Sequence, residues 1–150
     1  KPFNDVYGSQ AGDALIKFSA QTLSDAADPV LDFVGHIGGD DFMLVLGSKD
    51  WEQRLNVLLD DFQNACRRFY RTEHLEAGCF IAHNRLGQRQ EFPLLSLSIG
   101  VVQLHAHTCA QLDAGQLADL ASQAKHHAKD VPGHSLYLID TALAPQACSG

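Results

Sequence analysis

Two adjacent glycines and two adjacent carboxylates interrupt an otherwise apolar stretch, HIGGDDFMLVL, between His36 and Leu46. The residues on either side, 33–37 and 42–46, are largely β-branched, aromatic or aliphatic, as is typical of short strands. A Gly-Gly pair between two strands suits the positive φ angles of a tight hairpin turn. Alternatively, carboxylates beside flexible glycines suit a metal site that handles a triphosphate. The stretch predicts a β-hairpin, and these residues alone leave both interpretations of its tip open.

Helical and extended patterns alternate along the rest of the chain. Residues 1–12 are predicted to form a loop, and Asp13 is predicted as the N-cap of the helix that follows. Helices are expected at 14–23, at 49–71 with Asp50 as the cap, and at 115–129. Further strands are expected at 79–82, 92–104 and 135–139. Helices beside a mainly antiparallel sheet define an α+β domain.

Composition narrows the classes of function. The 150 residues fit one domain, expected at 1–140, with a tail at 141–150. A net charge of −7 argues against a nucleic-acid partner, whereas a small anionic ligand could still bind through backbone N–H groups or a cation. No apolar run approaches the roughly 20 residues of a membrane span, and no signal peptide is visible. A cytoplasmic protein without a membrane segment is therefore expected.

Cysteine and histidine spacing offers no clear metal site. The four cysteines form no C-x-x-C pair, and the eight histidines include one His-x-His and one adjacent pair. Neither pattern is typical of a zinc site or a disulfide framework. We therefore expect free thiols and surface histidines.

Four ordered blocks carry a family resemblance: FNDVYGSQAGD, HIGGDDF, LSLSIGV and AKDVPG. In order and approximate spacing they resemble a GGDEF domain, the diguanylate cyclase family, from Lys1 to about Asp140. The resemblance implies a palm or nucleotide-cyclase-like fold, with a ferredoxin-like βαββαβ core and a mostly antiparallel central sheet flanked by helices. The family's first strand, which carries a metal-binding Asp, would precede Lys1 and is not contained in this sequence. HIGGDDF and AKDVPG are also similar to GGDEF domains of composite bacterial proteins, which implies a linked sensor or EAL phosphodiesterase domain.

The resemblance implies an activity and its cofactor. The family condenses two GTP molecules into cyclic di-GMP across a homodimer, with Mg²⁺ (or Mn²⁺) neutralising charge on the phosphate oxygens. Asp40 matches the metal-binding acid, and Asp41 replaces the usual Glu. Lys1 matches a lysine that faces the phosphates. These three residues are the catalytic candidates, and Asp40 is the metal ligand.

The same resemblance implies a substrate site. Asn4 and Asp13 match the positions that hydrogen-bond the guanine edge. Gly38 and Gly39 would lie against the phosphates, and Lys129 matches the lysine that clamps the terminal phosphate. Each residue type also has an ordinary structural explanation, such as a helix N-cap for Asp13, an Asx turn at Asn4 or a C-terminal cation for Lys129.

Several positions depart from the family pattern. The segment after Lys129 runs from Asp130 to Ser135 without the usual phosphate-binding Arg. Losing a charge-assisted contact of roughly 1.5–3 kcal/mol would lower GTP affinity by one or two orders of magnitude. The inhibitory RxxD window has Pro29 in place of Arg and keeps Asp32, so product inhibition is not expected. His36 stands where the family usually has Arg.

The sequence supports several functions. The first is a diguanylate cyclase of weak activity, and the alternative is a degenerate GTP-binding domain that regulates a linked phosphodiesterase without turnover. A third is a structural dimerisation or docking domain that binds no nucleotide. A fourth is the polymerase-like subunit of type III CRISPR complexes, which also carries GGDD on a palm hairpin. The Asn4 to Asp13 block and LSLSIGV fit the GGDEF family better than this subunit.

Overall fold

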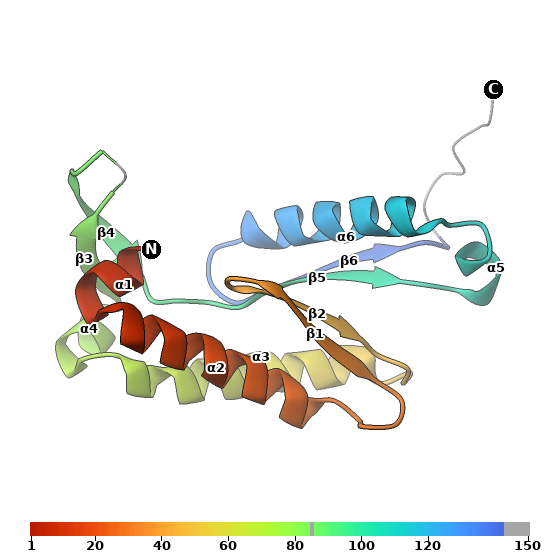
Figure 1. Ribbon diagram of the computed structural model, residues 1–150, viewed down its shortest axis with the longest axis horizontal. Coiled ribbons are helices and arrows are strands. Elements are labelled where there is room, and N and C mark those ends of the chain that lie inside the picture. Colours follow the sequence, from red (N-terminus) through yellow and green to blue (C-terminus); the bar gives the residue numbers. More distant parts are fainter. Residues whose placement is uncertain (85, 143–150) are drawn as a thin grey trace. The chain divides into compact units, whose positions relative to one another are not determined.

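The computed structural model describes residues 1–84 and 86–142, and it divides into two compact units with the boundary between Leu95 and Ser96 (Figure 1). The first unit contains α1 (Pro2–Tyr7), α2 (Ser9–Ala26), β1 (Phe33–Gly38), β2 (Asp41–Val45), α3 (Trp51–Cys66), a 3-10 turn (Arg67–Phe69), α4 (Thr72–Ala77), β3 (Cys79–His83) and β4 (Arg89–Pro93). The second contains β5 (Ser98–Gln103), α5 (Ala106–Cys109), α6 (Ala114–Lys129) and β6 (Ser135–Asp140). The expected mixture of helices and strands is therefore confirmed.

The described strands pair in three two-stranded sheets. β1 and β2 form one antiparallel hairpin, and β3 and β4 form another. Two of the three pairs are therefore antiparallel, as the sequence predicts, but the described strands do not join into the single central sheet that the resemblance implies. β5 and β6 run parallel. The reason is the connection, because α6 lies between these two strands in the chain and a helical crossover returns the second strand in the same direction.

The opening residues are helical, so the predicted loop at 1–12 is wrong. Gly8, with φ +88°, separates α1 from α2 and is the residue before the first turn of α2. Asp13 lies inside α2, so its prediction as an N-cap is also wrong. Tertiary packing explains the helix, because Phe3 is buried and Tyr7 stacks on it.

An aromatic cluster forms the core at one end of the first unit. Phe3, Tyr70, Phe80 and Ala82 are buried together, with the rings of Phe3 and Tyr70 edge to face at 5.6 Å. Burial raises the pKa of Tyr70 to about 12. The Tyr70 hydroxyl accepts a hydrogen bond from the Leu95 backbone N–H at 2.8 Å.

That hydrogen bond bears on the predicted strand at 92–104, which is wrong as a single element. Its first residues end β4 at Pro93, and its later residues form β5 from Ser98. Leu95 satisfies its N–H with a side chain instead of a neighbouring strand. The alternating apolar pattern of residues 92–104 therefore belongs to two strands in different sheets, β4 and β5.

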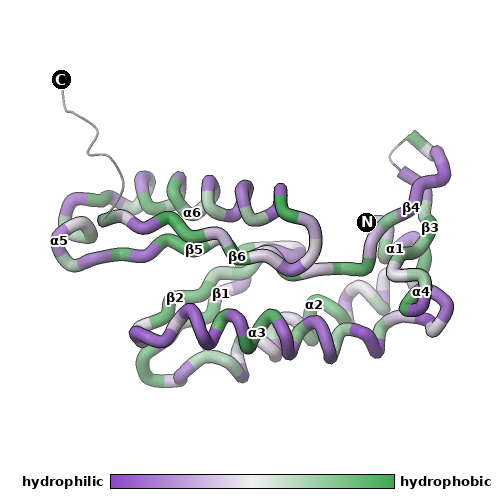
Figure 2. Tube along the Cα trace, turned by 180° about the vertical axis from the view of Figure 1, so that it is seen from behind, coloured by the Kyte–Doolittle hydropathy of each residue, from purple (hydrophilic) through white to green (hydrophobic). Residues whose placement is uncertain are grey.

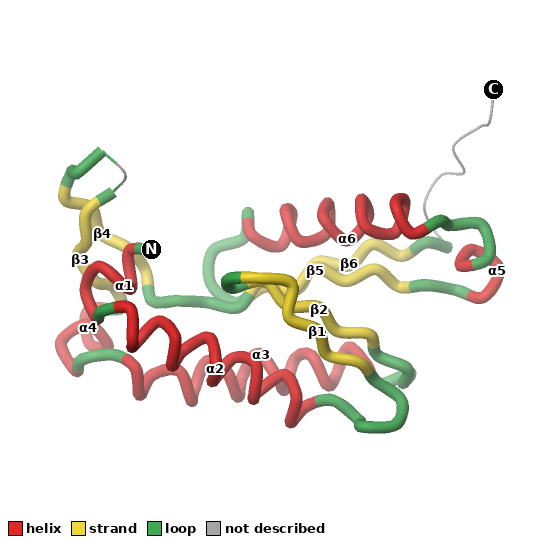
Figure 3. The backbone as a smooth tube through the Cα atoms, in the orientation of Figure 1, coloured by secondary structure: helices red, strands yellow, loops and turns green. Residues whose placement is uncertain are grey.

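The long helices agree with the predictions. α2 and α3 run alongside one another (Figure 3), and polar and apolar residues alternate along α3 and α6 (Figure 2). Buried side chains of α3 recur at helical spacing, at Leu55, Leu58, Leu59, Phe62 and Cys66. α3 gives way to a 3-10 turn after Cys66, earlier than predicted, and α4 follows where no element was expected.

The described helices and cysteines bear on the expected lack of a membrane segment and on the expected free thiols. None of the helices in residues 1–84 and 86–142 is both long enough and apolar enough to cross a membrane. Cys66, Cys79 and Cys109 are free thiols, and Cys148 lies outside the described residues, as does most of the predicted tail.

A glycine sets the distance between α6 and β5 in the second unit. A Cβ atom on Gly100 would lie 2.2 Å from the backbone N of Lys125 and 2.4 Å from the carbonyl carbon of Ala124. Ala124 and Ala128 on the facing side of α6 are completely buried. The Gly in LSLSIGV therefore permits close backbone contact between helix and strand.

Replacing Gly100 by Ala should destabilise the protein, because backbone atoms of α6 would have to move away. We expect Gly100→Ala to lower the free energy of unfolding in urea by about 1–3 kcal/mol, as overpacking does. The matched control is Gly115→Ala near the start of α6, at an exposed position, where we expect a change of less than about 1 kcal/mol. Equal effects of the two changes would contradict the packing role.

Candidate functional site

The GGDD stretch forms the tip of a β-hairpin, as predicted. Gly38 pairs with Asp41, so Gly39 and Asp40 make the turn between the strands. Gly39 has φ +57°, in the left-handed region that favours glycine, and no atom lies within 4 Å of where its Cβ would be. The register shifts between His36 and Gly38, which places a bulge immediately before the turn.

His36 supports this turn from the side, a role that sequence reasoning missed. Its Nε2–H donates to the Gly39 carbonyl oxygen at 2.9 Å. The imidazole also stacks on the Phe42 ring, with centroids 4.6 Å apart and planes 18° apart. The only signal in the sequence was the replacement of the family's usual Arg at this position.

The two carboxylates at the tip differ in their surroundings. Asp40 is exposed, whereas Asp41 is half-buried and interacts with other described residues. Within the described residues, no group of three His, Cys, Asp or Glu side chains could hold a metal ion. Mg²⁺ does not need such a cage, because one or two carboxylates together with phosphate oxygens and water normally complete its octahedron. The donor set of the tip therefore fits Mg²⁺ bound with a phosphate ligand.

The structure brings Asn4 and Asp13 to the junction of α1 and α2. The Asn4 side chain lies directly over Gly12, the residue that precedes Asp13 in α2. Asn4 and Asp13 are both exposed. Lys1 is the exposed residue before α1, and its carbonyl accepts from the Asp5 N–H at 3.1 Å. In the part of the chain that the structure describes, no hydrogen bond or ion pair joins these side chains to the hairpin tip.

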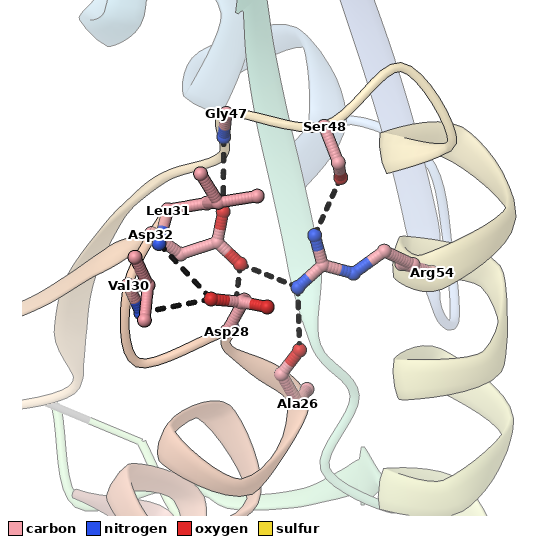
Figure 4. A network of polar contacts seen from close by, with 8 residues as sticks. All are labelled: Ala26, Asp28, Val30, Leu31, Asp32, Gly47, Ser48 and Arg54. Atoms are coloured by element: carbon pink, nitrogen blue, oxygen red, sulfur yellow. Dashed lines mark hydrogen bonds and ion pairs between the residues drawn. The ribbon is translucent and has the colours of Figure 1, made fainter.

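Asp32, the remaining residue of the inhibitory window, is half-buried, and its carboxylate is covered by hydrogen-bond donors of the protein (Figure 4). Its side chain has 0% exposure and lies 2.5 Å from Nη2 of Arg54 on α3. Its carboxylate also accepts from the backbone N–H of Gly47 at 2.9 Å and of Asp28 at 2.7 Å. The hydrogen bond from Arg54, followed by those two backbone donors, lowers the pKa of Asp32 to about 2.

Arg54 extends this network to two further segments. Nη2 donates to the Ala26 carbonyl at the end of α2 at 2.8 Å, and Nη1 donates to Ser48 Oγ after β2 at 2.6 Å. Asp32 raises the pKa of Arg54, so the guanidinium is charged at any working pH. One side chain of α3 therefore holds both ends of the β1–β2 hairpin against the end of α2.

Two candidate phosphate contacts lie in the second unit. Lys129 is the last residue of α6 and is exposed, with a partner of its own. His134, in the segment that lacks the family Arg, accepts from the Leu97 backbone N–H through Nδ1 at 3.0 Å. Because Nδ1 accepts this hydrogen bond, it carries no proton that it could donate to a phosphate.

The Asp32–Arg54 pair predicts a pH dependence. Because the pKa of Asp32 is about 2 in the folded protein and 3.8 in its ordinary state, the stabilisation is complete above about pH 4 and is lost as the pH falls through 2. We expect Arg54→Met to lower the urea midpoint at pH 7 and to flatten its decline between pH 4 and pH 2. Arg67→Met, at an exposed position of the 3-10 turn, should keep the native pH profile.

The comparisons with known proteins address the whole arrangement. A family model described as "Diguanylate cyclase, GGDEF domain" matches residues 1–131. The match includes α1, α2, the hairpin tip and all of α6. The comparisons with curated proteins and with solved structures found no match. The family model covers most of the 150 residues, and the chain therefore belongs to the GGDEF family of diguanylate cyclase domains, which implies GTP binding and cyclic di-GMP signalling.

Proposed function

We propose that this domain binds GTP with Mg²⁺ at the β1–β2 hairpin tip and condenses two GTP molecules into cyclic di-GMP as a homodimer. The observation that carries the proposal is the Gly39–Asp40 turn, where an exposed carboxylate stands beside a glycine backbone open to a ligand. Family membership supplies the substrate class. The same proposal includes a domain boundary near residue 140, a βαββαβ core and a linked sensor or phosphodiesterase domain.

The proposed reaction assigns separate tasks to the residues of the site. The reaction needs two transfers: in each, the 3′-hydroxyl of one GTP forms a bond to the α-phosphorus of the other, the bond to pyrophosphate breaks, and the hydroxyl proton is released. The second transfer closes the ring, so two pyrophosphates leave for each cyclic di-GMP. Asp40, with Asp41 beside it, would hold the cation, which neutralises charge developing on the phosphate oxygens. Gly38 and Gly39 let the phosphates approach the backbone. Lys1 is proposed to face the phosphates.

Asn4, Asp13 and Lys129 are the proposed contacts to the two ends of GTP. Asn4 and Asp13 offer amide and carboxylate groups for the guanine edge, and both are exposed. Lys129 offers an ammonium group for the terminal phosphate. Because Arg54 already neutralises Asp32, and Pro29 offers no donor, we do not expect cyclic di-GMP to bind at the former RxxD window.

A second candidate is a GTP-binding regulatory domain without turnover. The observation that favours it is His134, whose Nδ1 is bonded to the Leu97 N–H in the segment where a phosphate-binding Arg is missing. Arg would contribute up to five donors in a fixed fork, whereas a neutral His has one N–H. Weaker binding of the terminal phosphates would lower turnover more than recognition of the base.

The decisive experiment incubates the purified protein with GTP and Mg²⁺ and resolves the products by chromatography. We expect a cyclic di-GMP peak that Asp40→Ala reduces by about 100-fold or more, because even the loss of a side chain that only supports a metal ligand costs about 10–100-fold. Asp119→Ala, an exposed carboxylate on α6, is the matched control and should leave the peak unchanged.

Other outcomes separate the two candidates. Saturable GTP binding without product would favour the regulatory domain. A folded protein with neither binding nor product would contradict both candidates.

A further inference from the structure

The Asn4 side chain lies in the space that any side chain on residue 12 would occupy. A Cβ atom on Gly12 would be 2.0 Å from Asn4 Oδ1, 2.7 Å from Cγ and 2.9 Å from Nδ2. These three atoms are the end of the Asn4 side chain, and they are the three nearest atoms to that position. Gly12 is buried, while Asn4 itself is exposed. The carboxamide therefore rests on the bare backbone of α2.

The backbone of α2 does not itself require glycine at this position. Gly12 is in the fourth position of an 18-residue helix and is not among the residues with positive φ. In such a place Ala is the better helix former, since Gly costs more conformational entropy. The unfavourable helix residue at position 12 therefore coincides with a side-chain contact that leaves no room for a Cβ atom.

We propose that Gly12 is a positioning residue that determines base specificity by seating the Asn4 carboxamide beside Asp13. This inference rests on the proposed function, because it takes the bound ligand to be a guanine nucleotide. It goes further by assigning the selectivity to a residue that touches no ligand.

The chemistry of the pair explains the selectivity. Asp13 is the next residue after Gly12, and its carboxylate is an acceptor for the N–H groups at the N1 and N2 positions of guanine. Adenine has an unprotonated nitrogen at N1 and no amino group at C2, so it offers this carboxylate no donor there. Asn4 adds both an acceptor and a donor. Among the described residues, none forms a hydrogen bond with either side chain, so both remain available to a base.

A methyl group on residue 12 would displace the Asn4 carboxamide and leave the fold in place. Only the end of a short side chain has to move, and no backbone atom of another segment is among the three nearest atoms. We therefore expect the effects on stability and on nucleotide binding to differ. Gly12→Ala should keep or raise the urea midpoint of unfolding, while it weakens the binding of GTP.

The experiment measures GTP, inosine triphosphate and ATP binding by calorimetry for four proteins: native, Gly12→Ala, Asn4→Ala and the double variant. We expect Gly12→Ala to weaken GTP binding about tenfold, comparable to losing one hydrogen bond, and to narrow the preference for GTP over ATP. In the Asn4→Ala background the same change should have no further effect. Gly115→Ala, the same exchange in α6, should leave binding unchanged.

A readout without nucleotide tests the geometry itself. In the native protein, the Asn4 side-chain amide protons should show nuclear Overhauser effects to the Gly12 α-protons. Gly12→Ala should shift the amide resonances of Asn4.

The outcomes distinguish this inference from the proposed function. Two results would overturn the inference while the proposed function stands. In the first, the native protein and Gly12→Ala bind GTP equally well. In the second, Gly12→Ala weakens GTP binding by the same factor whether residue 4 is Asn or Ala. If the native protein binds no GTP, both are overturned. Tenfold weaker binding that depends on Asn4 supports both.

Discussion

The charged hydrogen bond between Arg54 and Asp32 is the interaction on which the geometry of the hairpin depends. Asp32 stands just before β1, and Gly47 and Ser48 come just after β2, so this network closes the hairpin at its open end. The same guanidinium also binds the last turn of α2. A carboxylate with 0% exposure would be costly without these donors. The position of the GGDD tip on the first unit therefore depends on one ion pair from α3.

Glycines have three separate physical roles in this domain. Gly39 supplies a left-handed turn, and Gly100 lets α6 approach the backbone of β5. Gly12 does neither, since its helical backbone accepts any residue, and its missing side chain makes room for Asn4. The family blocks thus contain glycines for folding and a glycine that we assign to recognition.

Predictions from the sequence were reliable where a pattern was local. The period of α3 and the turn at Gly38 and Gly39 follow from residues near one another in the chain, and both are found. The loop predicted before Asp13 failed because turn-forming residues were weighed without the aromatic cluster that anchors Phe3. Arg54 was not identified, since its partner is 22 residues away and the pairing depends on how α3 faces α2.

By itself the sequence determined the α+β composition, the hairpin around GGDD and the candidate site residues, because hydrophobic period, turn chemistry and ordered motifs are written locally. The tertiary structure decided which polar groups meet. It joined Asp32 to Arg54, placed the His134 imidazole on the Leu97 N–H, and laid the Asn4 carboxamide over Gly12. Such pairings depend on how helices and strands pack, and no local propensity encodes the distance between two side chains that are far apart in the chain.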